Sequence, residues 1–235
     1  MNKITRHIPN ALTLVNLLSG VTGLIFASQG DIKIAACFIW SGAVFDFFDG
    51  FFARKLKTFS DIGRELDSLA DMVTFGILPS MIMYYSIAGN FLSLNYLACS
   101  AFLIPVFSAL RLARFNIDPR QKEVFIGLPT PANAFFISGL PFLWESRPFQ
   151  FTGSPAFLVP ALVFTSVLMV SPFRFVSLKF KTPGIRGNAL KYLILISAIL
   201  LVLAFQARGV TPAVSLYIVV SLASALKTPS HAGMA

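Results

Sequence analysis

The sequence contains Asp46-Phe47-Phe48-Asp49-Gly50-Phe51-Phe52-Ala53-Arg54 and, after eight further residues, Gly63-Arg64-Glu65-Leu66-Asp67-Ser68-Leu69-Ala70-Asp71. Four of the ten acidic residues of the chain occupy the aspartate positions of this pattern. Long apolar runs flank it on both sides. A carboxylate in a membrane-spanning helix costs about 2.5–3.5 kcal/mol on the insertion scale, so such residues indicate function. Four of them together predict a metal site.

The spacing of the aspartates predicts that they converge. Asp46 and Asp49 are three residues apart and Asp67 and Asp71 are four apart, so each pair lies on one face of a helix. A short connection between the two helices brings the pairs together. Two like charges about 4 Å apart repel by about 4 kcal/mol at an effective dielectric constant of 20. Divalent cations would remove this repulsion, and carboxylate oxygens suit Mg²⁺, Mn²⁺ or Ca²⁺.

Small residues follow the second aspartate. Gly50 and Ala53 leave room for a ligand close to the helix, as a nucleoside diphosphate bridging two metals requires, and Arg54 can hold a phosphate oxygen. The alternative is that the aspartates form hydrogen bonds between helices or a proton path.

Composition predicts an all-α polytopic membrane protein in a single transmembrane domain, residues 1–235. Of the 235 residues, 56% are hydrophobic and 12% are charged, and the mean hydropathy is +0.75, whereas soluble domains have about 25% charged residues. Apolar runs reach the roughly 17–25 residues that cross a bilayer. Eight spans are expected: Asn10–Ser28, Ile32–Phe52, Arg64–Ala88, Leu94–Phe115, Thr130–Trp144, Ala156–Val176, Leu190–Gln206 and Val210–Leu226.

The basic residues predict the orientation of these spans. With alternate connections on alternate sides, one side receives sixteen of the nineteen Lys and Arg residues. By the positive-inside rule this side and both termini are cytoplasmic. The net charge of +9 therefore reports topology and attraction to anionic lipids rather than nucleic acid. The sixteen residues are Lys3, Arg6, Arg54, Lys55, Lys57, Arg64, Arg111, Arg114, Arg120, Lys122, Arg174, Lys179, Lys181, Arg186, Lys191 and Lys227; the other side receives Lys33, Arg147 and Arg208.

At the aspartate pattern the chain resembles the CDP-alcohol phosphatidyltransferases, whose signature D-x2-D-G-x2-A-R-x8-9-G-x3-D-x3-D it matches at every defined position. The resemblance implies a six-span core (residues 1–176), with about two additional C-terminal spans in residues 177–235. It also implies a homodimer in the cell membrane and a divalent metal pair at the cytoplasmic side. Asp46, Asp49, Asp67 and Asp71 would hold the metals, Asp71 would double as the general base, and the nucleotide site would contain Gly50, Ala53, Arg54 and Gly63.

Flanking motifs resemble the phosphatidylserine synthase branch of that family. They are Pro9-Asn10-Ala11-Leu12-Thr13-Leu14-Val15-Asn16, residues 65–79, Arg111-Leu112-Ala113-Arg114-Phe115-Asn116 and Gly127-Leu128-Pro129-Thr130-Pro131. The resemblance implies CDP-diacylglycerol and L-serine as substrates and places Asn10 and Thr13 near the nucleotide. Arg111 and Arg114 share a helix face and could fork onto the serine carboxylate; topological anchoring or a lipid phosphate contact is the alternative.

Three functions remain open. Direct displacement of CMP by an acceptor hydroxyl is the leading one, because the two histidines, His7 and His231, lie at the ends of the chain and leave no Ser/His or Cys/His pair in the bundle. A sibling transferase would use glycerol 3-phosphate, inositol phosphate or another alcohol. A divalent-cation transporter would place acids near the bilayer midplane, often within inverted repeats, and we find no repeat.

Overall fold

The computed structural model describes residues 7–58, 60–89, 95–118, 125–177, 184 and 188–227. Helices dominate these residues, which confirms the predicted all-α class. The elements in chain order are α1 (Ile8–Ser28), α2 (Ile32–Leu56), α3 (Asp61–Asp71), the π-helix η2 (Met72–Ile77), α4 (Leu78–Ala88), η3 (Ala98–Phe102), α5 (Leu103–Ile117), β1 (Phe125–Ile126), α6 (Thr130–Leu143), η5 (Arg147–Gly153), α7 (Pro155–Val170), β2 (Arg174–Phe175), α8 (Ala189–Phe205), η6 (Gln206–Gly209) and α9 (Val210–Lys227).

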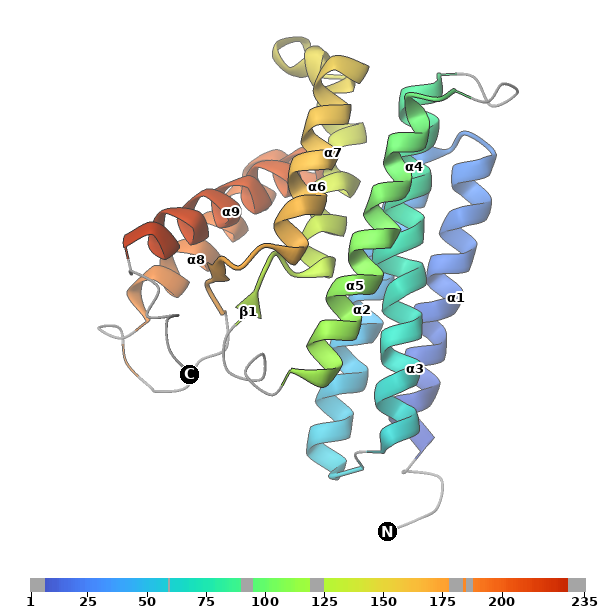
Figure 1. Ribbon diagram of the computed structural model, residues 1–235, viewed down its shortest axis with the longest axis vertical. Helices are drawn as coiled ribbons and strands as arrows, with labels where there is room; N and C mark the ends of the chain where they lie inside the picture. The colour runs from blue at the N-terminus through green and yellow to red at the C-terminus, as the bar shows by residue number, and fades with distance from the viewer. Residues whose placement is uncertain are drawn as a thin grey trace.

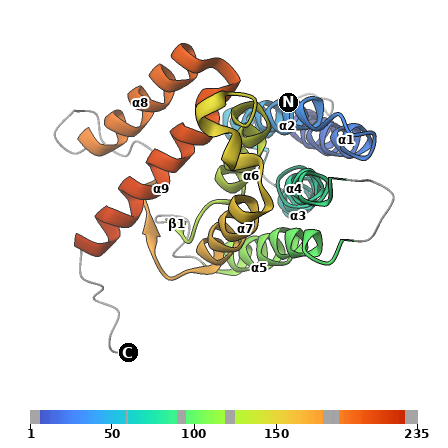
Figure 2. The same cartoon turned by 90° about the horizontal axis from the view of Figure 1, so that it is seen from above.

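Helices α1 to α5 run side by side along the long axis of the molecule (Figure 1). The segments α3, η2 and α4 continue one another as a single rod, which Figure 2 shows end-on. The end of α2 and the beginning of α3 lie at the same end of the bundle (Figure 1). The two aspartate pairs therefore lie on antiparallel neighbours, as the short connection between them predicts.

Small side chains set the distance between α1 and its neighbours. Thr13, Asn16, Gly20, Gly23 and Ala27 are buried and recur every three or four residues along α1. This spacing keeps them on one face of the helix. Small residues on such a face allow helix backbones to approach closely in a membrane.

The number of possible spans differs from the predicted eight. Five described helical segments are long and apolar enough to cross a membrane, and a sixth is reached if the pair η5 and α7, bent by 67°, counts as one span. The five are Ile8–Ser28, Ile32–Leu56, Asp61–Ala88, Ala98–Ile117 and Ala189–Leu226. The multi-pass class is therefore confirmed, and the count of eight is not.

Two regions explain the difference. Helix α6 has 14 residues, which span only about 21 Å at 1.5 Å per residue. Helices α8 and α9, expected as two separate spans, are joined by η6 into one apolar segment. They lie across the bundle axis, because both are seen lengthwise in Figure 2, where α3 and α4 are seen end-on.

A two-residue β-pairing ties the segment before α6 to the segment after α7. Phe125 pairs with Phe175 and Ile126 with Arg174, antiparallel. Gly127 follows at φ +79°, and a Cβ there would lie 2.1 Å from the carbonyl oxygen of Met169. Only glycine fits this turn, which fixes where α6 begins relative to α5 and α7.

The orientation of the bundle in the membrane stays a prediction. Of the basic residues behind it, Arg54, Lys55, Lys57 and Arg64 lie around the junction of α2 and α3. The side chain of Lys227 lies outside the described part of the structure. Seven further basic residues lie outside it entirely: Lys3, Arg6, Arg120, Lys122, Lys179, Lys181 and Arg186.

Candidate metal centre and nucleotide pocket

The aspartates are carried by the end of α2 and the beginning of α3. Lys57, in the left-handed conformation at φ 51°, ends α2. Ser60 begins α3 as its N-cap, because its hydroxyl accepts a 3.0 Å hydrogen bond from the backbone N–H of Gly63. Such capping satisfies an otherwise unpaired N–H of the first turn. Local residues therefore end α2 and begin α3 within a few positions of each other, which keeps the connection between the two helices short.

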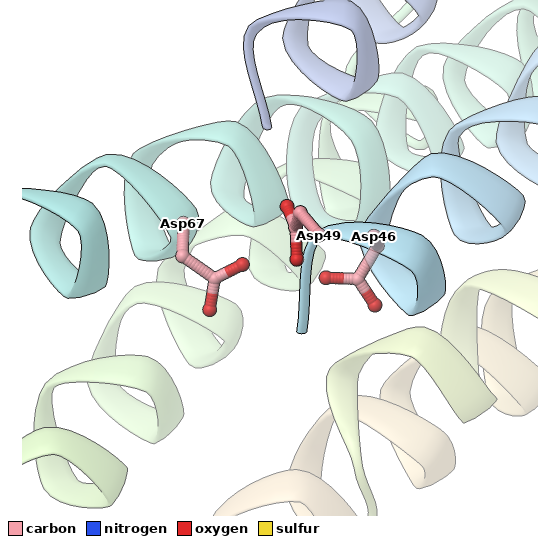
Figure 3. A group of neighbouring side chains, drawn as sticks. All are labelled: Asp46, Asp49 and Asp67. Atoms are coloured by element: carbon pink, nitrogen blue, oxygen red, sulfur yellow. The ribbon is translucent and has the colours of Figure 1, made fainter. Parts of the chain in front are cut away.

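Three of the four aspartates converge. Asp46, Asp49 and Asp67 each offer a carboxylate oxygen, and these oxygens all lie within 4.8 Å of one another. Figure 3 shows the carboxylate of Asp67 extending from α3 toward those of Asp46 and Asp49. Asp49 is 4% exposed. A cluster of hard oxygen donors that is buried or half-buried fits a divalent cation.

Asp71 adjoins this trio rather than belonging to it. Asp46 lies within hydrogen-bonding reach of both Asp67 and Asp71. Asp71 also accepts a 3.4 Å hydrogen bond at Oδ1 from the Nδ2 of Asn16 on α1. The structure thus brings all four predicted aspartates into one neighbourhood, with Asp71 at its inner edge.

Helix α1 contributes a hydrogen bond to the trio. The Thr13 hydroxyl lies 2.6 Å from Oδ2 of Asp49 and 3.1 Å from the carbonyl oxygen of Pro9. One hydroxyl has one proton, so the shorter contact takes it. Thr13 is 3% exposed and therefore makes a charge-assisted hydrogen bond away from water, which fixes one side of the Asp49 carboxylate.

A cavity of about 290 Å³ opens beside the trio, close to the roughly 300 Å³ at which ligand pockets begin. The predicted nucleotide residues Asn10, Thr13, Gly50, Ala53 and Gly63 line it, as do Asp49 and Asp67. Its remaining lining residues are Pro9, Thr58, Ser60 and Arg64.

Two glycines keep this cavity open. A Cβ on Gly63 would lie 2.9 Å from the Ser60 hydroxyl and 3.0 Å from Oδ1 of Asn10. A Cβ on Gly50 would meet Nη1 of Arg54 at 3.4 Å. Arg54 itself is exposed and does not line the cavity, but its guanidinium group lies over Gly50 at the rim.

Sequence reasoning missed Thr58, Ser60 and Arg64, which occupy the variable spacer and the first turn of α3. Thr58 Oγ1 is buried, and no hydrogen-bond partner for it lies in the described ranges. An orphaned hydroxyl in the cavity lining is available to a polar ligand. The aspartate pattern specifies no residue types at these three positions, so it could not predict that they line the cavity.

The two arginines predicted for the acceptor lie apart. Arg111 is 6% exposed, donates a 3.3 Å hydrogen bond to the Thr130 hydroxyl and covers the ring of Phe115 at 5.3 Å. It also interacts electrostatically with Asp71. Arg114 is exposed and donates to the carbonyl oxygen of Val170 at 3.4 Å. The two arginines thus have different partners in this structure, and of the two it is Arg111 that interacts with an aspartate, Asp71; the expected fork of both onto one carboxylate stays a prediction.

A buried asparagine one turn from Thr130, the hydrogen-bond partner of Arg111, was also missed. Asn133 lies one turn after Thr130 on α6 and is 0% exposed. Neither its Nδ2 nor its Oδ1 has a hydrogen-bond partner among the residues that the structure describes, and the same holds for Nε of Arg111. Buried polar atoms of this kind are rare in folded proteins and call for a water or a ligand.

Comparisons with known proteins assign the chain to a family. Residues 6–167 match the model of the CDP-alcohol phosphatidyltransferase family. The CDP-diacylglycerol–serine O-phosphatidyltransferase of Bacillus subtilis is 38% identical over 169 residues, which are 72% of this chain and 89% of that protein. The protein of the same name from Helicobacter pylori is 33% identical over 173 residues, 73% of this chain and 72% of its own length.

A third relative of that name, from Methanocaldococcus jannaschii, is 38% identical over 132 residues, 56% of this chain and 59% of that protein. The family match spans α1 to α7 and includes every predicted metal and nucleotide residue. This chain is a member of the CDP-alcohol phosphatidyltransferase family.

Proposed function

We propose that the chain transfers the phosphatidyl group of CDP-diacylglycerol to the hydroxyl group of L-serine, giving phosphatidylserine and CMP. The observation that carries the reaction class is the carboxylate trio of Asp46, Asp49 and Asp67 beside a cavity lined by small residues. The relatives named CDP-diacylglycerol–serine O-phosphatidyltransferase favour serine as the acceptor.

The four aspartates would hold a pair of divalent cations, Mg²⁺ or Mn²⁺, with Ca²⁺ as a further candidate. Their oxygen donors match the preference of these hard ions. Such ions neutralise charge on a pyrophosphate and make CMP a better leaving group. Thr13 would support the site from outside by holding the Asp49 carboxylate, as outer hydrogen bonds do in metal sites.

The CDP group would occupy the cavity beside the trio. Gly50, Ala53 and Gly63 would let the pyrophosphate approach the helices, and Arg54 at the rim would hold a phosphate oxygen. Asn10 and Thr13 would contact the nucleotide from α1. The acyl chains would extend from there into the bilayer.

Asp71 would act as the general base. Its carboxylate takes the proton of the serine hydroxyl, and the oxygen forms a bond to the phosphorus attached to diacylglycerol. The bond from that phosphorus to the CMP oxygen breaks in line with the attack, and CMP leaves. Asn16 donates a hydrogen bond to Oδ1 of Asp71, and the other carboxylate oxygen would face the acceptor.

The acceptor would bind between Asp71 and α6. Serine carries a carboxylate, an ammonium group and a hydroxyl, so it needs donors and acceptors together. Arg111 has an unused Nε and Asn133 an unused amide within the described part of the chain. Arg111 would bind the serine carboxylate, whereas Arg114, which was expected to join it, donates to the carbonyl oxygen of Val170 in this structure.

The enzyme would lie in the cell membrane with the aspartates toward the cytoplasm. The basic residues at the junction of α2 and α3 support this orientation. We further propose one transmembrane domain, with residues 1–176 as the catalytic core, residues 177–235 as added surface, and a homodimer as the assembly.

Acceptor competition tests the proposal. The purified chain, in liposomes with CDP-diacylglycerol and Mn²⁺ or Mg²⁺, should incorporate labelled serine into lipid and release one CMP for each serine. Glycerol 3-phosphate and inositol phosphate, added separately, should give no comparable product. Efficient transfer to one of those two instead would assign the chain to a sibling transferase, and metal flux without any CMP release would indicate a transporter.

A further inference from the structure

One turn inward from the metal centre, four residues form a close contact between three helices. Thr74 of η2 is 0% exposed, and its hydroxyl donates a 3.0 Å hydrogen bond to the backbone carbonyl oxygen of Asn16 on α1. Gly20 of α1 and Gly42 of α2 lie against the same side chain. We call Asn16, Gly20, Gly42 and Thr74 the Thr74 contact.

The two glycines form a notch that Thr74 fills. A Cβ on Gly20 would lie 2.5 Å from Oγ1 of Thr74 and 3.0 Å from its Cα. A Cβ on Gly42 would lie 2.5 Å from Cγ2 of Thr74 and 2.8 Å from Oδ1 of Asn16. No methyl group fits at either position without moving Thr74. The hydroxyl group of Thr74 therefore packs against Gly20 on α1, and its methyl group packs against Gly42 on α2.

Asn16 connects this contact to Asp71. Its side chain is 0% exposed, and Nδ2 donates to Oδ1 of Asp71 at 3.4 Å. Its Oδ1 faces the space above Gly42 and accepts no hydrogen bond within the described part of the chain. Only the donor end of the amide thus reaches the carboxylate, and the backbone that carries it is held by Thr74.

The segment that holds Thr74 is a π-helix. It begins at Met72, directly after Asp71, and ends at Ile77. Such segments are rare, lose the regular hydrogen bonds of an α-helix and occur often at functional sites. A side-chain hydrogen bond from this segment to a second helix compensates for its weaker internal bonding and sets where Asp71 lies relative to α1.

We propose that Asn16 and Thr74 are positioning residues for Asp71. Thr74 fixes the backbone of α1 at Asn16, and the Asn16 amide then holds one oxygen of the Asp71 carboxylate, so that the other oxygen faces the acceptor. This inference rests on the proposed role of Asp71 as the general base. It assigns a function to the third polar residue of α1, beside Asn10 and Thr13 at the nucleotide.

Two conservative substitutions of Thr74, to valine and to serine, distinguish a positioning role from a packing role. Thr74→Val keeps the shape and removes the donor, so kcat should fall about tenfold, the size of one hydrogen bond worth up to about 1.4 kcal/mol. Thr74→Ser keeps the donor and loses the methyl group in the notch, so it should recover most of kcat. If Thr74 only filled space, the serine variant would be the slower of the two, which would overturn the proposal.

Steady-state constants and a double mutant complete the test. The KM for CDP-diacylglycerol, and the Kd for CDP measured by calorimetry, should stay within about twofold in Thr74→Val, because the nucleotide cavity is lined by other residues. Asn16→Ala should lower kcat as Thr74→Val does, and the double variant should fall no further, because both act on Asp71 in series. Additive losses, or a loss carried by the KM for CDP-diacylglycerol, would contradict positioning.

Glycine variants provide a matched control. Gly20→Ala displaces Thr74, whereas Gly23→Ala, one turn further on α1, would place its Cβ 2.5 Å from Cδ2 of Leu78 and 2.9 Å from Cβ of Phe38. Both crowd the helix interface, but only the first touches the link to Asp71. Per folded protein, measured by gel filtration in detergent, Gly20→Ala should lose kcat and Gly23→Ala should keep it. Equal losses in both would refute the inference.

The proposed function and this inference fail differently. The acceptor used by the unmodified chain tests the function, and all variant rates are measured as CMP release with whichever alcohol that chain accepts. A wild-type chain that transfers to another alcohol would refute serine as the substrate. The ratio of the kcat of Thr74→Val to the kcat of Thr74→Ser would still decide whether Thr74 positions Asp71 or only fills space.

Discussion

The hydrogen bond from Thr13 to Asp49 gives a quantitative test of the metal centre. We expect Thr13→Val to weaken metal binding, because valine keeps the shape of threonine and removes its hydroxyl. The 2.6 Å contact to Oδ2 of Asp49 is then lost, and Asp49, at 4% exposure, has little access to water as a replacement.

The size of the effect follows from the chemistry of this contact. Hydrogen bonds to charged groups contribute about 1.5–3 kcal/mol, and each 1.4 kcal/mol is a factor of ten. Loss of a hydrogen bond that orients a metal ligand typically weakens metal affinity or activity by about 10–100-fold. The lower part of that range applies, since a bound cation itself neutralises the carboxylate. We therefore expect the Mn²⁺ or Mg²⁺ concentration for half-maximal activity to rise by about tenfold or more.

Activity titrated against metal concentration measures this shift, and the metal-dependent rise in Tm provides an independent reading. Thr13→Ser is the matched control, because it retains the hydroxyl and should titrate close to the wild type. A valine variant with the metal requirement of the wild type, in both assays, would show that Thr13 does not support the metal centre.

The remaining predictions concern the base, the acceptor and the metal. Asp71→Asn should reduce turnover to background while CDP-diacylglycerol binding stays measurable. The control Asp31→Asn, at the exposed far end of α2, should leave turnover intact. Near-normal turnover in Asp71→Asn would exclude Asp71 as the base. Arg111→Ala should raise the KM for serine by at least tenfold, the effect of losing one charge-assisted hydrogen bond. The KM for CDP-diacylglycerol should change little. An unchanged KM for serine would exclude an acceptor role for Arg111. Exhaustive chelation should abolish activity and added Mn²⁺ or Mg²⁺ should restore it, so vigorous metal-free activity contradicts the centre.

The aspartate neighbourhood was predictable because helix geometry is periodic. Spacings of three and four residues place side chains on one face whatever the tertiary structure. The short connection then leaves the two helices little choice but to pack as antiparallel neighbours. Asp46, Asp49 and Asp67 met as expected, and the small residues that follow Asp49 line the cavity as expected.

Periodicity failed for long side chains. Arg111 and Arg114 are three residues apart on α5, yet one turns inward to Thr130 and the other outward to the carbonyl group of Val170. A shared face fixes where the Cβ atoms lie, but an arginine has four further torsions that local partners decide. Those partners come from α6 and from the end of α7, which are distant in the sequence.

Hydropathy also failed to count the spans. An apolar run shows that a segment avoids water but does not show whether it runs along or across the bundle. Helices α8 and α9 are apolar enough to be membrane spans, yet they lie across the bundle axis (Figure 2). The Thr74 contact was hidden for a related reason, since Gly20, Gly42 and Thr74 have no common spacing and meet only through packing.

The depth of each residue in the bundle explains how one site can handle both a nucleotide and a lipid. At 1.5 Å per residue, Asp49 and Asp67 lie about 10 Å from the shared end of α2 and α3, and Asp46 and Asp71 lie about 15 Å from it. The hydrocarbon core is about 30 Å thick, so with the shared end at the cytoplasmic surface, as we propose, all four would lie within one leaflet. The cavity that we propose for CDP is lined by the shallow pair, whereas Arg111 interacts with the deep Asp71.

This gradient matches the connectivity of the substrate. In CDP-diacylglycerol the cytidine must remain near water, the acyl chains must remain in the bilayer, and the phosphorus under attack lies between them. A base at the deep end of the cluster can therefore reach an acceptor on the lipid side of that phosphorus while CMP departs toward the shallow end. In the proposed mechanism, the hydrogen bond from Asn16 would hold Asp71 at that depth, beside the carboxylates of Asp46 and Asp67 and the guanidinium group of Arg111.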